Sequence, residues 1–256
     1  ELGQVYASLG SKVTVVEYLP SLVPGADSDI IKPLQRKLNK QFEQILLSSK
    51  VVNVSETKQD QLSVQIEDKN GIKEQVFDKI LISVGRTPNI NNLKLENTNV
   101  ELNEAGFIKV NEYQKTTVNS IYAIGDIVGN PMLAHKATYQ GKIAAEVISG
   151  HPAVYDVKTV PSVVYTDPEV AWAGLTEKEA KENEIPYEKG EFPWAASGKA
   201  LILNANQGKT KILFNPENKQ VIGVGIVGPS AGDIISEAML AIEMGSDAED
   251  IGLTMH

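Results

Sequence analysis

Two short stretches of this chain combine residue types at a spacing that could bind a cofactor. Residues 120–128 form an apolar run that ends in Gly125-Asp126, and residues 131–136 begin a helical pattern with a proline. A strand that ends in an aspartate offers a carboxylate to ligand hydroxyl groups, and a helix that starts nearby offers backbone N–H groups without intrahelical partners. Such a pair can hold a polyol and an electron-rich ring edge at once. The combination favours a flavin.

The helix start is expected to act through its backbone, at Met132, Leu133, Ala134 and His135. The positive end of the helix dipole would stabilise negative charge on a reduced flavin. The imidazole of His135 is given no catalytic role. The alternative is an aspartate in a loop beside an ordinary capped helix, but the short separation of Asp126 from the helix in sequence favours the flavin site.

A second acid, Glu17, closes the β-branched run Val13-Thr14-Val15-Val16 after a predicted helix. In a dinucleotide-binding βαβ unit, an acid at this point accepts hydrogen bonds from the adenosine ribose, and it repels a ribose phosphate, which favours NAD over NADP. The glycine fingerprint that normally precedes such an acid is not in the chain. An isolated glutamate equally fits a solvated charge at the end of a strand.

A third candidate is the segment Ser83-Val84-Gly85-Arg86, which follows a predicted buried strand over residues 79–84. Glycine at position 85 could let the backbone approach a ligand closely. The alternative is a plain turn after the strand, and the residues by themselves do not separate the two.

The composition argues against several classes of function. With 24 Lys and Arg against 33 Asp and Glu, the chain has a formal net charge of -9, and no basic stripe exists to displace counterions from nucleic acid. The absence of cysteine removes disulfides and thiolate metal sites from these residues, and three histidines far apart in sequence argue against zinc. No apolar run is long enough to span a bilayer. We expect an acidic, metal-free protein of the cytoplasm.

The hydrophobic pattern predicts a mixed α/β fold, with an antiparallel sheet and helices in the last part of the chain. Asp27 or Ser28 is expected to cap the second helix, and Thr176 with Glu179 forms a capping box. Apolar residues at helical spacing and β-branched runs mark the elements. The predicted helices cover residues 2–9, 28–46, 136–148, 176–183 and 232–244, and the predicted strands cover residues 13–16, 51–54, 62–66, 73–77, 79–84, 107–110, 120–124, 162–165, 187–192, 210–214 and 221–227.

Four motifs of the chain occur together in one protein family. Gly-Arg-Thr-Pro-Asn at residues 85–89 and Ile-Gly-Asp-Ile-Val at residues 124–128 are shared by many reductases that bind two dinucleotides. Tyr-Thr-Asp-Pro-Glu-Val-Ala at residues 165–171 and Phe-Pro-Trp-Ala-Ala-Ser-Gly-Lys at residues 192–199 are particular to the lipoamide enzymes. On these motifs the whole chain resembles the dihydrolipoyl dehydrogenase family of pyridine nucleotide-disulfide oxidoreductases.

The resemblance implies FAD and NAD as cofactors and a fixed order of parts. Residues 1–90 would be part of a Rossmann-type NAD-binding domain, residues 91–158 a segment of the FAD-binding domain, and residues 159–256 a dimerisation domain truncated at its end. The intact enzyme would be a homodimer that oxidises dihydrolipoamide and binds the E2 acyltransferase core of 2-oxo acid dehydrogenase complexes. Glu17 and Val51 would bind the NAD ribose and adenine, Ser83, Val84, Gly85 and Arg86 would line the nicotinamide side, and Gly125, Asp126, Met132, Leu133, Ala134 and His135 would hold FAD.

The resemblance also implies groups that the chain lacks. In the family a cysteine pair passes electrons from dihydrolipoamide to the flavin, and no cysteine is present here. The family's general base is the second histidine of a His-x-His-Pro motif that is followed by a glutamate, and His256 matches only the first histidine. We therefore expect a piece of a longer protein, one that does not oxidise dihydrolipoamide by itself.

Two other functions stay open at this point. One is a related reductase for glutathione, mercuric ion or NADP-linked transhydrogenation, against which Glu17 and residues 165–171 argue. The other is a dimerisation module without a catalytic role, in which flavin would be absent while residues 159–256 still self-associate.

Overall fold

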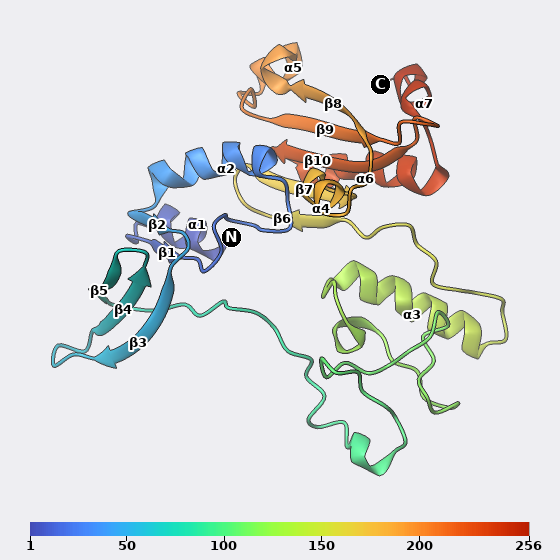
Figure 1. Cartoon of the computed structure of the whole chain (residues 1–256), viewed down its shortest axis with the longest axis horizontal. Coiled ribbons are helices and arrows are strands. Elements are labelled where there is room, and N and C mark those ends of the chain that lie inside the picture. The colour runs from blue at the N-terminus through green and yellow to red at the C-terminus, as the bar shows by residue number, and fades with distance from the viewer. Residues whose placement is uncertain (256) are drawn as a thin grey trace. The chain divides into compact units, whose positions relative to one another are not determined.

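The largest sheet is built around two strands rich in small and β-branched residues. In the computed structural model, which describes residues 1–255, β7 (Glu169–Gly174) and β10 (Val221–Gly228) pair antiparallel at the centre of a five-stranded sheet (Figure 1). The strand order is β6-β7-β10-β9-β8. Its edge strands are β6 (Ser162–Val164) and β8 (Glu188–Pro193), and β9 (Lys209–Phe214) lies between β10 and β8.

Each face of this sheet carries a helix, because alternate side chains of a strand point to opposite faces. On one face Ala171 and Val224 pack with α6 (Ala231–Met244), through residues such as Ile235. On the other face Val170 and Val227 pack with α2 (Ser28–Gln41). The α2 contact is close, since a Cβ at Gly225 would lie only 3.0 Å from the side chain of Ile30. Two apolar cores therefore enclose the sheet.

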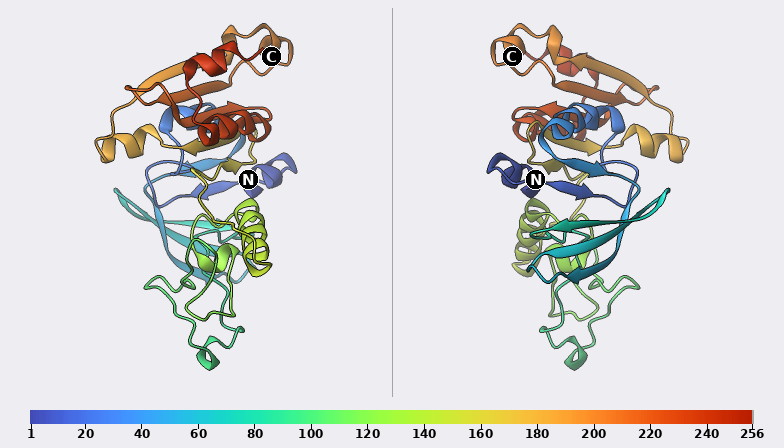
Figure 2. Two further views of the ribbon diagram at one scale, coloured as in Figure 1. Left: turned by 90° about the vertical axis from the view of Figure 1, so that its right-hand side faces the viewer. Right: turned by 90° about the vertical axis from the view of Figure 1, so that its left-hand side faces the viewer.

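The first part of the chain adds two smaller sheets to the same compact unit, which comprises Glu1–Leu81 and residues 161–255. After α1 (Leu2–Ser8), strand β1 (Thr14–Val16) pairs parallel with β2 (Gln44–Leu46). Strands β3 (Lys50–Glu56), β4 (Leu62–Asp68) and β5 (Gly71–Phe77) then form a twisted antiparallel sheet (Figure 2). The connection from β4 to β5 is a tight turn in which Gly71 adopts a positive φ of 111°, as a hairpin turn requires.

The second compact unit, Ile82–Val160, has little regular structure apart from one long helix. That helix is α3 (Ala134–Ile148), and two short 3-10 turns precede it, η1 (Leu95–Asn97) and η2 (Gly125–Val128). The remaining short elements all belong to the first unit: α4 (Glu177–Glu182), η3 (Trp194–Ala196), α5 (Gly198–Ile202) and α7 (Ala248–Leu253). No helix among residues 1–255 is both long and apolar enough to cross a bilayer.

The predicted helix over residues 28–46 is too long at its end. Helix α2 stops at Gln41, and Phe42 is already extended, with φ of -92° and ψ of 150°. The next residues form β2 because β1 offers them a parallel partner, with Val15 opposite Ile45. A neighbouring strand thus overrides a helical apolar spacing that would otherwise continue.

The predicted buried strand over residues 79–84 is also wrong. These residues form no strand, and Ile82 and Val84 are 76% and 93% exposed. A strand needs a neighbour for its backbone groups, and none of the described residues supplies one at this place. The predicted strands over residues 107–110 and 120–124 fare similarly, since they are reduced to the isolated bridges Leu102↔Ile108 and Lys115↔Tyr122.

Candidate functional site

The start of helix α3 carries no side-chain cap. Leu133 stands at its N-cap position, no side chain makes a capping hydrogen bond there, and the first turn holds no acidic residue. The first N–H groups of an α-helix have no acceptor within the helix, so they bind water, a cap or a ligand. The helix dipole makes this end favourable for an oxygen that carries negative charge.

Gly125 and Asp126 lie against the first half of this helix. The Gly125 N–H donates to the buried Oε1 of Gln140 at 2.8 Å. Gly125 also has a positive φ of 78°, and a Cβ there would lie 3.1 Å from the Cβ of Ala137. Small residues on one face of α3 thus admit the η2 backbone closely, and this contact places Asp126 beside the helix.

Lys136 ties the loop before α3 to the first helical turn. Its side chain is buried, and Nζ donates to the Gly129 carbonyl oxygen at 2.5 Å. Burial lowers the pKa of Lys136, and the negative charge of Asp126 opposes that shift. The backbone from residue 129 to the helix start therefore has a fixed course past Asp126.

Arg86 reaches the same place from the segment that sequence reasoning assigned to the nicotinamide side. Its NH2 group donates to the Asp126 carboxylate, and its NH1 group donates to the Met132 carbonyl oxygen at 3.0 Å. One guanidinium thus contacts both the acid and the backbone just before α3. Sequence reasoning missed this contact, because no residue pattern links positions forty residues apart within irregular chain.

Of the other predicted site residues, Glu17 and Val51 belong to the first compact unit and residues 83–86 to the second. Glu17 follows β1 and is half-buried, and its Oε1 accepts the Leu19 N–H at 2.8 Å. The Ser49 N–H donates to the Glu17 carbonyl at 3.0 Å, which brings the beginning of β3, with half-exposed Val51, next to that acid. The ligand-binding roles of all these residues stay predictions. His256, predicted to match the first histidine of the family's motif, lies outside the described residues.

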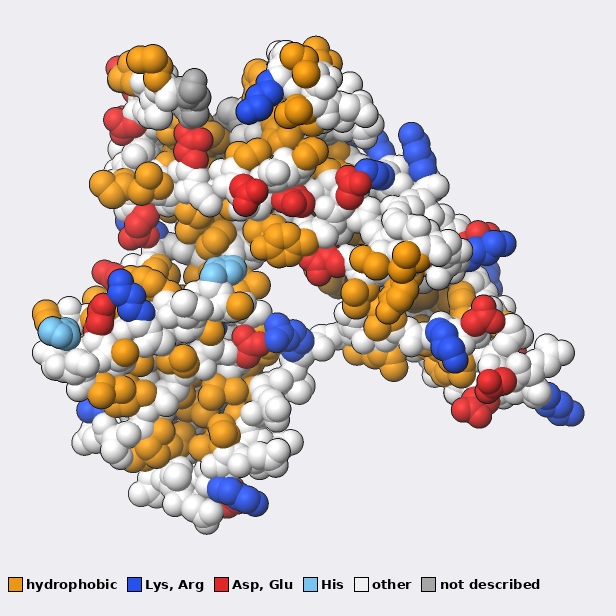
Figure 3. All heavy atoms as spheres, turned by 180° about the vertical axis from the view of Figure 1, so that it is seen from behind, with side chains coloured by type: hydrophobic (Ala, Val, Ile, Leu, Met, Phe, Trp, Pro, Cys, Tyr) orange, Lys and Arg blue, Asp and Glu red, His pale blue; other side chains and the backbone are white. Residues whose placement is uncertain are grey.

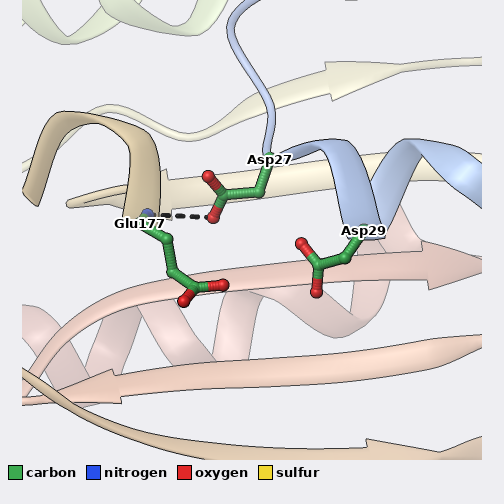
Figure 4. Close-up of side chains that lie close together, drawn as sticks. All are labelled: Asp27, Asp29 and Glu177. Atoms are coloured by element: carbon green, nitrogen blue, oxygen red, sulfur yellow. Dashed lines mark hydrogen bonds between the residues drawn. The ribbon is translucent and has the colours of Figure 1, made fainter. Parts of the chain in front are cut away.

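A cluster of charged side chains lies in the first unit, where Asp27, Asp29 and Glu177 bring three carboxylates together (Figure 4). Their oxygens lie within 4.8 Å of one another, a spacing that could hold a metal ion. However, Nζ of the buried Lys211 lies 2.6, 2.7 and 3.0 Å from oxygens of the three carboxylates. The ammonium of Lys211 is the cation of this cluster.

Asp27 also corrects a sequence expectation about capping. It occupies the N-cap position of α2, but its side chain makes no hydrogen bond to that helix. Instead its carboxylate accepts the Glu177 and Lys178 N–H groups at 3.0 and 3.1 Å, at the start of α4. The predicted capping box of α4 is present as well, between Thr176 and Glu179. The cluster therefore joins α2, α4 and the sheet.

The ion pairs set the protonation of the cluster. Burial by itself would raise the pKa of Asp29, but hydrogen bonds from Lys209 and Lys211 outweigh it and lower the pKa to about 2. Burial would also raise the pKa of Glu177. Hydrogen bonds from Lys211 and Tyr187 outweigh that effect, and the pKa of Glu177 falls to about 2. The pKa of Lys211 is raised, because three carboxylate hydrogen bonds overcome the cost of burying its charge.

Two sequence profiles match the chain. The pyridine nucleotide-disulphide oxidoreductase profile covers residues 1–141, and the dimerisation-domain profile of the same proteins covers residues 160–256. This chain belongs to the pyridine nucleotide-disulphide oxidoreductases. Membership in that family implies FAD and NAD as cofactors.

The relatives of this oxidoreductase chain include dihydrolipoyl dehydrogenases. Those of Buchnera aphidicola from Schizaphis graminum and of Vibrio cholerae are each 48% identical to it, and that of Haemophilus influenzae is 45% identical. The alignments cover all of this chain and 54%, 54% and 53% of the relatives. The chain therefore spans about half the length of the curated relatives it matches.

Solved structures agree on the fold of the oxidoreductase chain. The HOCl-induced flavoprotein disulfide reductase RclA from Escherichia coli, as its Cu(II) complex, and LpdA from Mycobacterium tuberculosis each superpose with a TM-score of 0.90. Both are 24% identical, and the match covers all of this chain and 58% and 55% of theirs. The predicted mixed α/β class, with a Rossmann-like part and a dimerisation domain, is thus confirmed.

Replacement of Lys211 by alanine is expected to destabilise the first unit of the oxidoreductase chain by about 3–5 kcal/mol, because three clustered carboxylates lose their cation. The measurement is urea unfolding followed by tryptophan fluorescence, since both tryptophans, Trp172 and Trp194, lie in this unit. The control is Lys219→Ala, which removes an exposed pair with Glu188 and should cost less than about 1 kcal/mol. Equal losses in the two variants would contradict the assignment.

Lowering the pH is expected to reduce the stability of the first unit through Asp29 and Glu177, before general repulsion between positive charges does so. Asp29 and Glu177 have folded-state pKa values near 2, below their ordinary values of 3.8 and 4.5, so they stabilise the fold fully above about pH 5 and lose that contribution as the pH falls toward 2. The urea midpoint should therefore drop on acidification, and it should drop less in the double variant Asp29→Asn/Glu177→Gln. A parallel drop in variant and parent would show that other groups govern the acid response.

Proposed function

We propose that this chain forms the NAD-binding, FAD-binding and dimerisation parts of a dihydrolipoyl dehydrogenase. The observation that carries the proposal is the meeting of the Asp126 carboxylate with the uncapped start of α3, in a chain whose relatives at 48% identity carry that name. The intact enzyme would pass two electrons from dihydrolipoamide through a disulfide and FAD to NAD. FAD, when bound, supplies the hydride chemistry, and the protein supplies orientation and electrostatics.

The donor and acceptor groups at the α3 site suit a flavin. The Asp126 carboxylate can accept a hydrogen bond from a ribityl hydroxyl. The helix start at residues 132–135, where the helix dipole is positive, would face the pyrimidine edge of the ring. The Lys136 ammonium, buried one turn away, keeps the loop before the helix in place for both contacts. We infer that Gly125, Asp126 and residues 132–135 together form this part of the FAD site.

The resemblance also supplies a set of proposed NAD contacts. Glu17 would accept hydrogen bonds from the adenosine ribose hydroxyls, Val51 would lie against the adenine, and residues 83–86 would line the nicotinamide side. Support comes from Glu17 at the end of a parallel strand, where an acid has this role in dinucleotide-binding folds. The carboxylate would also disfavour a ribose phosphate, and so favour NAD over NADP.

We infer the same division of the chain that the resemblance implies, with residues 1–90 in the NAD-binding domain, 91–158 in the FAD-binding domain and 159–256 in the dimerisation domain. A homodimer is supported by the matched dimerisation profile and by the exposed apolar side chains of Leu240 and Met244, which are 64% and 72% exposed. Figure 3 shows that hydrophobic side chains reach the surface at several places on the face it presents. Within its 2-oxo acid dehydrogenase complex the enzyme would bind the E2 acyltransferase core, in the cytoplasm.

The 256-residue chain is expected not to oxidise dihydrolipoamide with NAD, because these residues include no cysteine to accept the electrons. The matched experiment replaces the corresponding part of the Vibrio cholerae relative with this chain, which restores the remaining half of the sequence. That chimera should be yellow and active, and Asp126→Asn should reduce its flavin content. Both proteins are assayed with dihydrolipoamide and NAD.

Two outcomes would overturn the proposal. Turnover by the chain by itself would refute the assigned need for a cysteine pair, and a folded chimera without flavin would refute the FAD site. A visible spectrum and sedimentation of the purified chain distinguish the proposed flavoprotein from the remaining alternative, a dimerisation module without cofactor. A dimerisation module without cofactor would sediment as a dimer in the presence of FAD and remain colourless after gel filtration.

A further inference from the structure

We propose that Arg86 is a positioning residue for the flavin site, which it serves by holding the Asp126 carboxylate and the backbone before α3 in one arrangement. This inference rests on the proposed function and deepens it. It adds a contact with Asp126, the acid proposed to face the flavin, to the nicotinamide-side position that the resemblance gives Arg86. The contacts that support it all lie within the second compact unit.

The geometry is that of a two-armed clamp. The NH2 arm of the guanidinium donates to Oδ2 of Asp126, and the NH1 arm donates to the Met132 carbonyl oxygen at 3.0 Å. Met132 immediately precedes Leu133, the N-cap residue of α3. Because a guanidinium is planar and rigid, binding both acceptors fixes the acid relative to the helix start. A lysine ammonium has no such fork.

The sequence makes this reach possible through the glycine before the arginine. Gly85 has a φ of 136°, a region open to glycine and strained for other residues. The Arg86 side chain remains 65% exposed, and that of Asp126 is 36% exposed. An exposed pair of this kind contributes little to stability, so its value lies in orientation.

Two consequences for the flavin follow. First, Arg86 binds Oδ2 of Asp126 and leaves Oδ1 to accept a hydrogen bond from a ligand hydroxyl. Because the carboxylate is already held in one rotamer, less conformational entropy is lost on binding and the ligand binds more tightly. Second, a bare carboxylate would repel the negative charge that a flavin gains on reduction. Arg86 offsets that repulsion, so the clamp should raise the reduction potential as well as the affinity.

The test compares Arg86→Met, Arg86→Lys, Asp126→Asn and the double variant Arg86→Met/Asp126→Asn in the chimera described above. FAD is titrated into the apoprotein, and the reduction potential of the bound flavin is measured. Arg86→Met should weaken FAD binding about ten-fold and lower the potential, and lysine should restore only part of both. The double variant should bind FAD with about the affinity of whichever single variant binds FAD less tightly, because the two residues act as one unit.

A matched control and a measurement without flavin keep the inference separate from the proposed function. Lys109→Met breaks the exposed Lys109–Glu101 pair of the same unit and should leave FAD binding unchanged. Amide hydrogen exchange of residues 133–137 in the flavin-free chain should speed up in Arg86→Met and remain at the parent rate in Lys109→Met. If Asp126→Asn weakens FAD binding and Arg86→Met does not, the inference is wrong and the proposed function stands. If the parent chimera binds no FAD, both fall together.

Discussion

A polar group that leaves water must find a partner inside the protein, and this constraint decides where the elements of the chain meet. The Lys211 ammonium could be buried only among several carboxylates, and those carboxylates come from α2 and α4. In the other unit, the Gly125 N–H is satisfied by Gln140 and the Lys136 ammonium by the Gly129 carbonyl. In each case a single buried donor joins segments that the chain keeps apart, and the candidate site inherits its geometry from these junctions.

Much of the fold could be predicted where one segment carries its own signal. The strands β8, β9 and β10 and the helices α3, α4 and α6 follow from alternation, helical spacing and caps within a dozen residues. Prediction failed where the outcome depends on a neighbour. Residues 44–46 became a strand because β1 lies beside them, and residues 79–84 did not because the described chain offers them no partner. β7 was missed because Pro168 directly precedes it, it begins with Glu169, and small alanines at positions 171 and 173 weaken its strand pattern.

The candidate site divides in the same way. Asp126 and the start of α3 are close in sequence, so an apolar run that ends in Gly-Asp, followed by a helical pattern, was enough to predict that they lie near one another, although the run itself forms only an isolated bridge. The Arg86 contact spans forty residues of irregular chain, and no periodicity encodes it. Lys136 was missed for another reason. A lysine in the first turn of a helix is ordinarily solvated, and only the fold of residues 129–133 buries it. Pairings set by loops are therefore the part that sequence reasoning cannot reach.

The uncovered segment at residues 79–84 has a consequence for how the chain behaves in concentrated solution. Leu81, Ile82 and Val84 are 57%, 76% and 93% exposed, and their backbone groups belong to no sheet. A short β-branched run with open backbone donors and acceptors is a template for intermolecular strand addition. Self-association would then grow by edge-to-edge pairing, without a closed stoichiometry, and a charged residue at position 82 would suppress it while leaving the five-stranded sheet untouched.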